Sequence, residues 1–192
     1  MSRSEPGDDP SAELLRRARE GDSEALDRLV SLHLASVYRV ALGILGSEAD
    51  AQDASQEGVI RALRGLAGFR GDASFRTWLL SIVANEARSL LRRSARRREA
   101  RLDDEVAPGL VDEATAHGSA GNVADGVVLR AEAARVRVLL ARLPEKQRLA
   151  VQLRVDEGLS FREVGEVIGS TEGAARVNYH HGIRRLREWL ER

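Results

Sequence analysis

The chain of 192 residues contains no cysteine and only one lysine, Lys146. The absence of cysteine excludes disulfides, thiol catalysis and zinc sites with cysteine ligands. No apolar run approaches the 18 residues of a membrane span, and no signal peptide opens the chain. We therefore expect a cytoplasmic protein that does not insert into a membrane.

The sequence also lacks the residue sets of an enzyme site. No Ser/His/Asp set, carboxylate pair or phosphate-binding loop stands in a coherent arrangement. The adjacent pair His180-His181 would be a poor chelate, because neighbouring residues on a helix point about 100° apart. We expect no catalytic residue, no cofactor, no metal site and no small-molecule substrate, and hence no enzyme.

A net charge is absent as well, since 30 basic residues balance 30 acidic ones. Any attraction to nucleic acid must therefore come from local charge. That charge is segregated: residues 74–101 hold eight arginines against two glutamates, whereas residues 102–128 hold six acids and no arginine or lysine. Nearly every cation is an arginine, whose planar guanidinium pairs in a fork with phosphates and base edges.

The arginine-rich stretch has the apolar spacing of a helix with one buried side. Ser74 is placed to cap its N-terminus. The apolar positions are Phe75, Trp78, Leu79, Ile82, Val83, Leu90 and Leu91. A different face carries Ser81, Asn85, Arg88, Arg92 and Arg96, with Arg93 and Arg97 beside it. A helix with one packed side and one arginine-rich side is suited to binding a phosphate backbone. The end of a basic helix that is only exposed to solvent would give the same pattern.

Helices are also expected upstream of this stretch. Ser11–Glu20 reads as a short helix that Gly21 ends, and Asp22 then caps one long helix. The apolar stripe of that helix is Leu26, Val30, His33, Val37, Ala41 and Ile44. We expect His33 to lie at the edge of the core rather than to bind a ligand.

A further helix follows Gly46 and runs to about Leu66, with Ser47 and Asp50 resembling a capping box. Its expected buried side is Ala51, Ala54, Val59, Ile60 and Leu63. Its other side is an acidic edge made of Asp50, Asp53 and Glu57, with Gln56 beside them. Acids in the first turns also complement the helix dipole, so stability alone could account for some of them. The next loop, AGFRGDA, leaves Phe69 and Arg70 available for contact.

The last third of the chain predicts a helix-turn-helix. We expect one helix over Val127–Ala141 and a second that starts with Pro144 as its first helical residue and ends at Gly158. A third helix is expected over Ser160–Ile168, where Ser160 and Glu163 form a capping box, and a fourth from Glu172 onward. Gly165 is small where two helices would cross, and Gly169 suits the turn. The last helix offers Arg176, Asn178, His180, His181, Arg184 and Arg185 to a partner, with Ile183, Leu186 and Leu190 packing behind.

These elements predict an all-α protein of two small helical domains. Residues 1–10 are expected to be disordered, residues 11–101 to form a helical bundle, residues 102–126 a flexible acidic linker, and residues 127–192 the helix-turn-helix domain.

Three motifs in this order resemble the extracytoplasmic-function (ECF, group IV) sigma factors of bacterial RNA polymerase. They are DAQDASQE (Asp50–Glu57), FRGDASFRTWL (Phe69–Leu79) and the stretch Leu143–Glu188. The resemblance implies a sigma region 2 bundle and a sigma region 4 helix-turn-helix. It also implies three partners: core RNA polymerase, promoter DNA and an anti-sigma factor.

The resemblance further implies roles for particular residues. Polymerase would be bound by Asp50, Asp53, Gln56 and Glu57. The minus-ten element would be contacted by Phe69, Arg70, Asn85, Arg88, Arg92 and Arg93. The minus-thirty-five element would be read by Thr171, Gly173, Arg176, Val177, His180, His181 and Arg184. Of the aromatic residues, only Phe69 is expected to be free to stack on a base. Such stacking is worth roughly 1–3 kcal/mol, against about 1.4 kcal/mol for each broken DNA step. One captured base is therefore feasible, while a long bubble needs polymerase.

Two other classes stay open. A stand-alone helix-turn-helix regulator would bind DNA without polymerase, but it leaves the acidic edge and the FRGDASFRTW loop unexplained. A sigma mimic would sequester an anti-sigma factor without touching DNA. Such mimics normally carry a receiver domain and lack the basic face.

Overall fold

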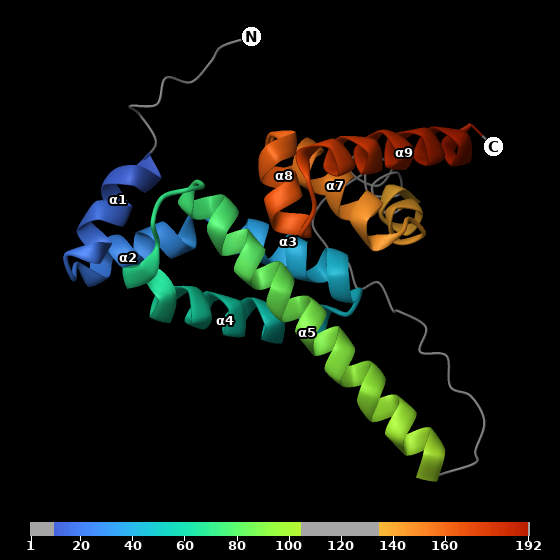
Figure 1. Cartoon of the computed structure of the whole chain (residues 1–192), viewed down its shortest axis with the longest axis horizontal. Coiled ribbons are helices and arrows are strands. Elements are labelled where there is room, and N and C mark those ends of the chain that lie inside the picture. Colours follow the sequence, from blue (N-terminus) through green and yellow to red (C-terminus); the bar gives the residue numbers. More distant parts are fainter. Residues whose placement is uncertain (1–9, 105–134, 192) are drawn as a thin grey trace, which may run out of the picture.

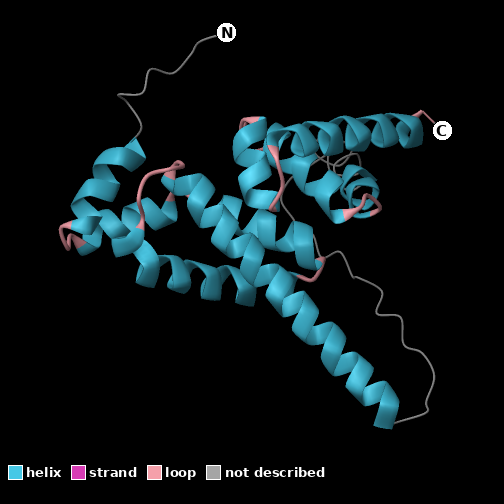
Figure 2. Ribbon diagram, in the orientation of Figure 1, coloured by secondary structure: helices cyan, strands magenta, loops and turns pink. Residues whose placement is uncertain are grey.

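The computed structural model describes residues 10–104 and 135–191, and all regular structure within these ranges is helical (Figures 1 and 2). The first domain contains α1 (Pro10–Arg19), α2 (Ser23–Ser31), α3 (Leu34–Leu45), α4 (Glu48–Gly65), a 3-10 turn (Leu66–Gly68) and α5 (Phe75–Asp104). In the second domain residues 135–141 are helical, and α7 (Glu145–Val155), α8 (Phe161–Ile168) and α9 (Glu172–Leu190) follow. The all-α prediction is confirmed.

The core of the first domain lies where α3, α4 and α5 pack against one another, with α1 lying against α2 beside them (Figure 1). Leu79, Leu80 and Val83 of α5 are fully buried there. Gly58 lets α4 come close to α5, because a Cβ at this position would lie 2.8 Å from a methyl group of Val83. The C-terminal half of α5 projects away from this core (Figure 1).

Side-chain caps fix several helix starts where the sequence predicts them. Asp22 accepts from the backbone N–H of Ala25 at 3.0 Å, and the Ser74 hydroxyl accepts from that of Thr77 at 3.1 Å. At α8 the reciprocal capping box of Ser160 and Glu163 is complete. Each of these bonds satisfies a donor that the first helical turn leaves free.

The single helix expected after Asp22 is wrong, because the chain bends by 48° between α2 and α3. Periodicity could not reveal the break, because apolar residues continue at helical spacing on both sides of it. The fully buried residue before the bend is Leu29, whereas Leu26 and Val30 of the predicted stripe are half-buried. No glycine or proline marks the break. His33 stands at the start of α3, buried with its ring centroid 5.7 Å from that of Phe75, which confirms its place at the core edge.

Smaller expectations also need correction. Ile60 and Leu91 are exposed rather than packed, at 42% and 43%. Pro144 precedes α7 as its N-cap, with the extended backbone angles φ −52° and ψ 142°. The first helix begins at Pro10, and α5 runs three residues beyond the expected boundary at residue 101. The disorder expected over residues 1–10 lies outside the described residues except for Pro10, and the linker expected over residues 102–126 does so from residue 105 onward. Residues 127–134 of the helix expected over Val127–Ala141 also lie outside them.

The two domains pack against each other. Helix α8 lies against α5, and α7 lies against α3 (Figure 1). Buried apolar side chains of both domains form one continuous cluster, which includes Val40 and Ala41 of α3 as well as Leu149 and Leu153 of α7. The domains therefore make direct contact, while the flexible linker predicted between them stays a prediction.

Candidate functional site

The acidic edge lies on the outer face of α4. Asp50, Asp53, Gln56 and Glu57 are all exposed, while the small residues on the opposite face of the helix are buried against the core. Of the three acids on this edge, only Glu57 has a basic partner within the described residues, Arg61 at 4.0 Å. The other carboxylates are available to a partner with positive charge.

A buried carboxylate on α5 was missed by the sequence reading. Glu86 is 2% exposed, and it pairs with Arg61 of α4 at 2.9 Å and with Arg93 at 2.8 Å. The head group of Arg93, a residue predicted to contact DNA, is therefore held against Glu86. The only sequence signal was an acid at a position adjoining the apolar stripe.

The predicted DNA-binding face of α5 is divided. Asn85 and Arg92 are exposed, and Arg92 has no ion pair within the described residues. Arg88 is only 17% exposed. Its Nε donates to a carboxylate oxygen of Glu145 at 2.8 Å, and a second nitrogen donates to the carbonyl of Val167 at 3.4 Å. Both partners belong to the second domain, which therefore covers this part of the face.

The loop before α5 departs from expectation in one residue. Phe69, expected to be free, is 6% exposed, with ring centroids 4.9 Å from Trp78 and 6.1 Å from Phe75. The 3-10 turn over Leu66–Gly68 directs this ring into the core. Arg70 is exposed and forms an ion pair with Asp72 at 3.3 Å. In this conformation, only Arg70 of the two is accessible to nucleic acid.

Helix α9 presents its predicted residues to solvent. The exposed set is Thr171, Gly173, Arg176, Val177, His180, His181 and Arg184. The opposite side is held close to its neighbours, since a Cβ on Gly182 would lie 2.7 Å from a methyl group of Val151. Gly165 of α8 meets the turn equally closely, because a Cβ there would lie 2.9 Å from the carbonyl oxygen of Ser170. This close packing gives the helix-turn-helix a fixed geometry.

Phe161 was also missed and lies beside the exposed face of α9. The guanidinium carbons of Arg154 and Arg176 stand 5.0 and 4.9 Å from its ring centroid, a cation–π distance. The ring of Tyr179 meets it edge-on at 5.5 Å. Arg176 also pairs with Glu172 at 2.9 Å, so its head group is oriented before any partner arrives.

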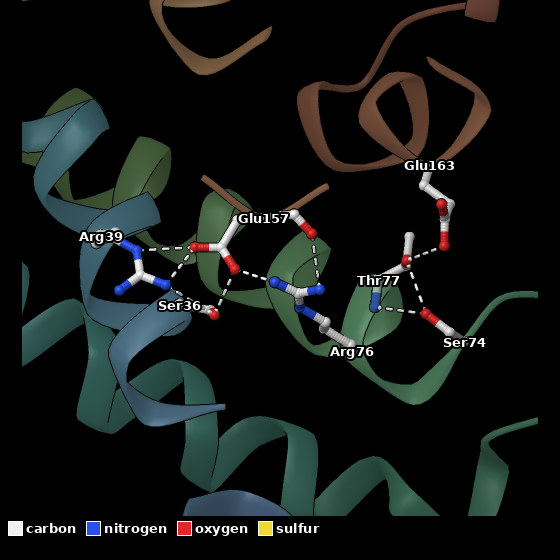
Figure 3. A network of polar contacts seen from close by, with 7 residues as sticks. All are labelled: Ser36, Arg39, Ser74, Arg76, Thr77, Glu157 and Glu163. Carbon is white, nitrogen blue, oxygen red and sulfur yellow. Dashed lines mark hydrogen bonds and ion pairs between the residues drawn. The ribbon is translucent and has the colours of Figure 1, made fainter. Parts of the chain in front are cut away.

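A polar cluster joins the two domains around Glu157, in the loop between α7 and α8 (Figure 3). Its carboxylate is 3% exposed and accepts from the Ser36 hydroxyl at 2.6 Å, from Arg39 at 2.5 and 2.8 Å, and from Arg76. Arg76 also donates to the Glu157 carbonyl at 2.9 Å. Burial opposes ionisation, but these donors outweigh it, and the pKa of Glu157 lies below its usual range.

Two further polar contacts cross the same boundary. The Thr77 hydroxyl donates to Glu163 at 3.1 Å, which ties the start of α5 to the capping box of α8 (Figure 3). Arg148 of α7 donates to the carbonyl of Gly43 at 2.6 Å, and burial lowers the pKa of this guanidinium. None of these partnerships has a signal in the sequence, because the partners stand 86 and 105 residues apart.

The described residues include no group of three or more His, Cys, Asp or Glu arranged to hold a metal ion. No single described helix has both the length and the apolar character to cross a membrane, although the bent pair α2–α3 together matches such a span in composition.

Two family models match the chain: Sigma-70 region 2 over residues 29–97, and Sigma-70, region 4 over residues 139–188. The chain is 31% identical to the ECF RNA polymerase sigma factor SigE of Mycolicibacterium smegmatis, covering 97% of this chain and 70% of that one. It is also 31% identical to the RNA polymerase sigma-H factor of Pseudomonas aeruginosa, covering 94% and 91%. SigM of Mycobacterium tuberculosis H37Rv is 33% identical, covering 93% and 84%.

Solved structures share the fold. CnrH, in complex with the cytosolic domain of CnrY, superposes with a TM-score of 0.67 at 23% identity, covering 95% of this chain and 98% of that one. The sigma factor RpoE of Bartonella quintana, in complex with the anti-sigma factor NepR, has the same TM-score at 22% identity, covering 86% and 96%.

Proposed function

The chain belongs to the extracytoplasmic-function sigma factors, and we propose which of its surfaces perform the two tasks of such a factor. Those tasks are binding core RNA polymerase and directing it to promoters for transcription initiation. An alternative sigma factor of this kind is a regulator and not an enzyme. Because bacterial polymerase works in the cytoplasm, the chain acts there.

The exposed edge of α4 binds core polymerase. Asp50, Asp53 and Glu57 place three carboxylates along one accessible side, with Gln56 between them. Only Glu57 is near a cation within the described part of the chain, so the edge keeps most of its negative charge for a basic partner. Charge complementarity of this kind speeds encounter and fixes the register of docking.

Promoter DNA is contacted by α9 and by the arginine side of α5. Arg176, His180 and Arg184 stand on the exposed face of the second helix of a helix-turn-helix, the helix that enters the major groove in such motifs. Asn85 and Arg92 occupy the exposed part of α5. The single observation that supports the assignment best is that this face of α9 is exposed to solvent, while Gly182 on the opposite side packs on Val151 of α7.

An anti-sigma factor is a further partner in this proposal. RpoE of similar fold is solved in complex with the anti-sigma factor NepR. A protein that prevents α4 or α9 from reaching its target would silence this chain. Co-purification of this chain with a defined candidate anti-sigma factor tests this partner.

Run-off transcription tests the function directly. The purified chain is added to core polymerase on a library of promoter sequences, and the enriched templates are sequenced. We expect transcripts that depend on the chain and share two spaced elements. Transcription equal to that of core polymerase alone would contradict the proposal. Specific DNA binding without polymerase would then favour a helix-turn-helix regulator, and capture of an anti-sigma factor without DNA binding would favour a sigma mimic.

A further inference from the structure

Glu86 on α5 is a buried carboxylate that two arginines share. Only 2% of its side chain is exposed, and its oxygen Oε1 accepts from Arg93 of the same helix at 2.8 Å. The other oxygen, Oε2, lies 2.9 Å from a guanidinium nitrogen of Arg61 on α4, and within the described residues it accepts no directed hydrogen bond. A buried carboxylate is costly unless cations compensate its charge. Glu86 therefore keeps both arginine head groups beside it, although they come from different helices.

The two arginines are nevertheless open to solvent. The side chains of Arg61 and Arg93 are 58% and 55% exposed with the second domain in place, whereas Arg88 is 17% exposed. A guanidinium carries N–H donors on three nitrogens, and each of these two contacts Glu86 through its Nη2 nitrogen. The donors on the other nitrogens are therefore available to a ligand that approaches from solvent.

The surroundings of this pair carry a surplus of positive charge. Two arginines on one carboxylate leave one positive charge in excess. Arg64, one turn along α4 from Arg61, and Arg92, beside Arg93 on α5, are both exposed and have no ion pair within the described residues. Glu57 lies 4.0 Å from Arg61, but the proposed function assigns this acid to polymerase. The surplus favours an anionic ligand at the seam between α4 and α5.

A backbone phosphate of DNA has the chemistry that this pair recognises. Guanidinium groups bind phosphate oxygens through two parallel hydrogen bonds, and this geometry adds specificity to the charge attraction. Because both head groups contact the same carboxylate, they lie close enough to bind one phosphate together. Arg93 also belongs to the arginine-rich side of α5, next to the exposed Arg92, so a DNA strand along this side would pass the pair.

We propose that Glu86 holds Arg61 and Arg93 as a joint site for one backbone phosphate of DNA. Arg61 is then a DNA contact that α4 contributes, and Glu86 is a positioning residue that does not itself touch the DNA. This inference rests on the DNA-binding role of α5 proposed above. An arginine that is ordered in advance loses less conformational freedom on binding, so the held pair binds phosphate more tightly than two mobile arginines would.

The salt dependence of binding to a mixed-sequence DNA duplex tests the shared site. Fluorescence anisotropy measures the affinity of the full chain from low salt upward. Arg61→Ala and Arg93→Ala should each weaken binding about tenfold, the usual effect of losing a hydrogen bond to a charged group. Together they should reduce the logarithmic salt slope by about 0.9, the value for one phosphate, rather than by about 1.8. Arg28→Ala on α2 is the matched control and should change neither quantity, because Arg28 is equally exposed and also pairs with an acid, Glu24, at 2.7 Å.

Glu86→Gln separates positioning from charge. This variant keeps the shape of the side chain and removes a negative charge, which by itself would tighten DNA binding. Positioning predicts the reverse, about tenfold weaker binding, because the released arginines have to be ordered when DNA binds. Glu24→Gln removes the same charge from an exposed acid and is the control. In a chain that already carries Arg61→Ala and Arg93→Ala, Glu86→Gln should cause no further loss, a coupling that a purely structural role would not produce.

A lysine variant keeps the test valid if the alanine variants fold poorly. Alanine at both positions leaves a buried acid unpaired, whereas Arg61→Lys with Arg93→Lys still compensates Glu86. This variant should match the parent in circular dichroism. It should bind DNA about tenfold more weakly with an unchanged salt slope, because the charges remain and the planar forks are lost.

Parental affinity in the double alanine and double lysine variants would overturn the phosphate site, as would a parent chain that does not bind the duplex at the lowest salt. Tighter binding by Glu86→Gln would overturn the positioning role. If the same variants lost co-purification with core polymerase but kept their DNA affinity, the arginines would serve polymerase and the proposal would be wrong. The proposed function fails separately, through the absence of run-off transcription, and the duplex affinities would still report on this site in that case.

Discussion

Arg88 on α5 and Glu145 at the start of α7 form a 2.8 Å ion pair across the domain boundary, although 57 residues separate them in sequence. One turn further along α5, Arg92 is exposed and has no ion pair within the described residues. The same helix thus presents one occupied and one available arginine on neighbouring turns, and this pair allows a matched test.

The first prediction compares these two arginines. In the free chain, Arg92→Ala should weaken binding to duplex DNA and reduce the salt slope by about 0.9, the value for one phosphate contact. Arg88→Ala should change neither, because Glu145 already neutralises Arg88. Fluorescence anisotropy at several salt concentrations measures both. Equal losses from the two variants would mean that Arg88 is accessible.

The second prediction concerns promoter opening. With core polymerase present, replacing Arg88, Arg92 and Arg93 together by alanine should leave polymerase binding intact and stop opening, since lost phosphate contacts weaken the complex. Permanganate reactivity at the minus-ten element measures opening. Reactivity equal to that of the parent would show that this face of α5 does not hold the promoter.

The third prediction concerns the α4 edge. Asp53→Lys with Glu57→Lys reverses two exposed charges and should abolish co-purification with core polymerase, because like charges then face each other. Glu24→Lys with Asp27→Lys on α2 reverses two equally exposed acids away from the edge and serves as the control. Normal yield of holoenzyme with the α4 variant would exclude this edge as the binding surface.

The fourth prediction concerns packing within the helix-turn-helix. Gly165→Ala forces a Cβ to within 2.9 Å of a backbone carbonyl, which cannot move aside like a flexible side chain. We expect a loss of about 1–3 kcal/mol in the free energy of unfolding, the usual cost of overpacking. Gly173→Ala is the control: its Cβ meets open space, and alanine is the better helix former. Thermal unfolding that ranks the two variants in the opposite order would contradict this account.

The fifth prediction is a loss of domain docking in acid. Burial opposes ionisation of Glu157, but hydrogen bonds from Ser36, Arg39 and Arg76 of the first domain hold its pKa below the usual 4.5. The contribution of Glu157 to docking is therefore complete above pH 4.5 and is lost as the pH falls through the lowered pKa. Asp156 acts in the opposite sense, because burial raises its pKa and favours its protonated form while the domains are docked. The cations that face Glu157 are Arg39 and Arg76.

Labels on cysteines introduced at the exposed positions Gln52 on α4 and Glu188 on α9 report the distance between the domains. This distance, followed from pH 7 to pH 3 together with circular dichroism, measures the loss of docking. The domains should separate while the helices persist, and Glu157→Gln should remove most of the change. If the short distance between the labels and the helical signal were lost at the same pH, acid would be acting on the whole fold rather than on docking.

Local signals were sufficient to predict most helix boundaries. Asp22, Ser74 and Ser160 each cap a helix as expected, and Gly46 and Gly169 end helices with left-handed backbone angles, φ +70° and +65°. These features depend on residues within one helical turn of each other, so they can be read from the sequence. The helix-turn-helix followed from the same kind of signal.

Features that depend on distant partners could not be predicted in this way. Glu157 stands in an ordinary-looking Asp-Glu-Gly turn, and nothing in that turn indicates Ser36 or Arg76 as partners. Phe69 sits in a glycine-containing loop that reads as exposed, yet its ring completes an aromatic cluster with Trp78. The acidic edge and the α9 face were predicted as exposed surfaces, and their roles in binding stay predictions.

The continuity of α5 has a mechanical consequence. At 1.5 Å per residue, its 30 residues make a rod of about 45 Å. One end bonds to α8 through Thr77, and the other projects from the core (Figure 1). A tilt of about 10° around the middle of the rod would displace each end by roughly 4 Å. A partner that displaces the projecting end of α5 would therefore also displace the Thr77–Glu163 hydrogen bond at its other end.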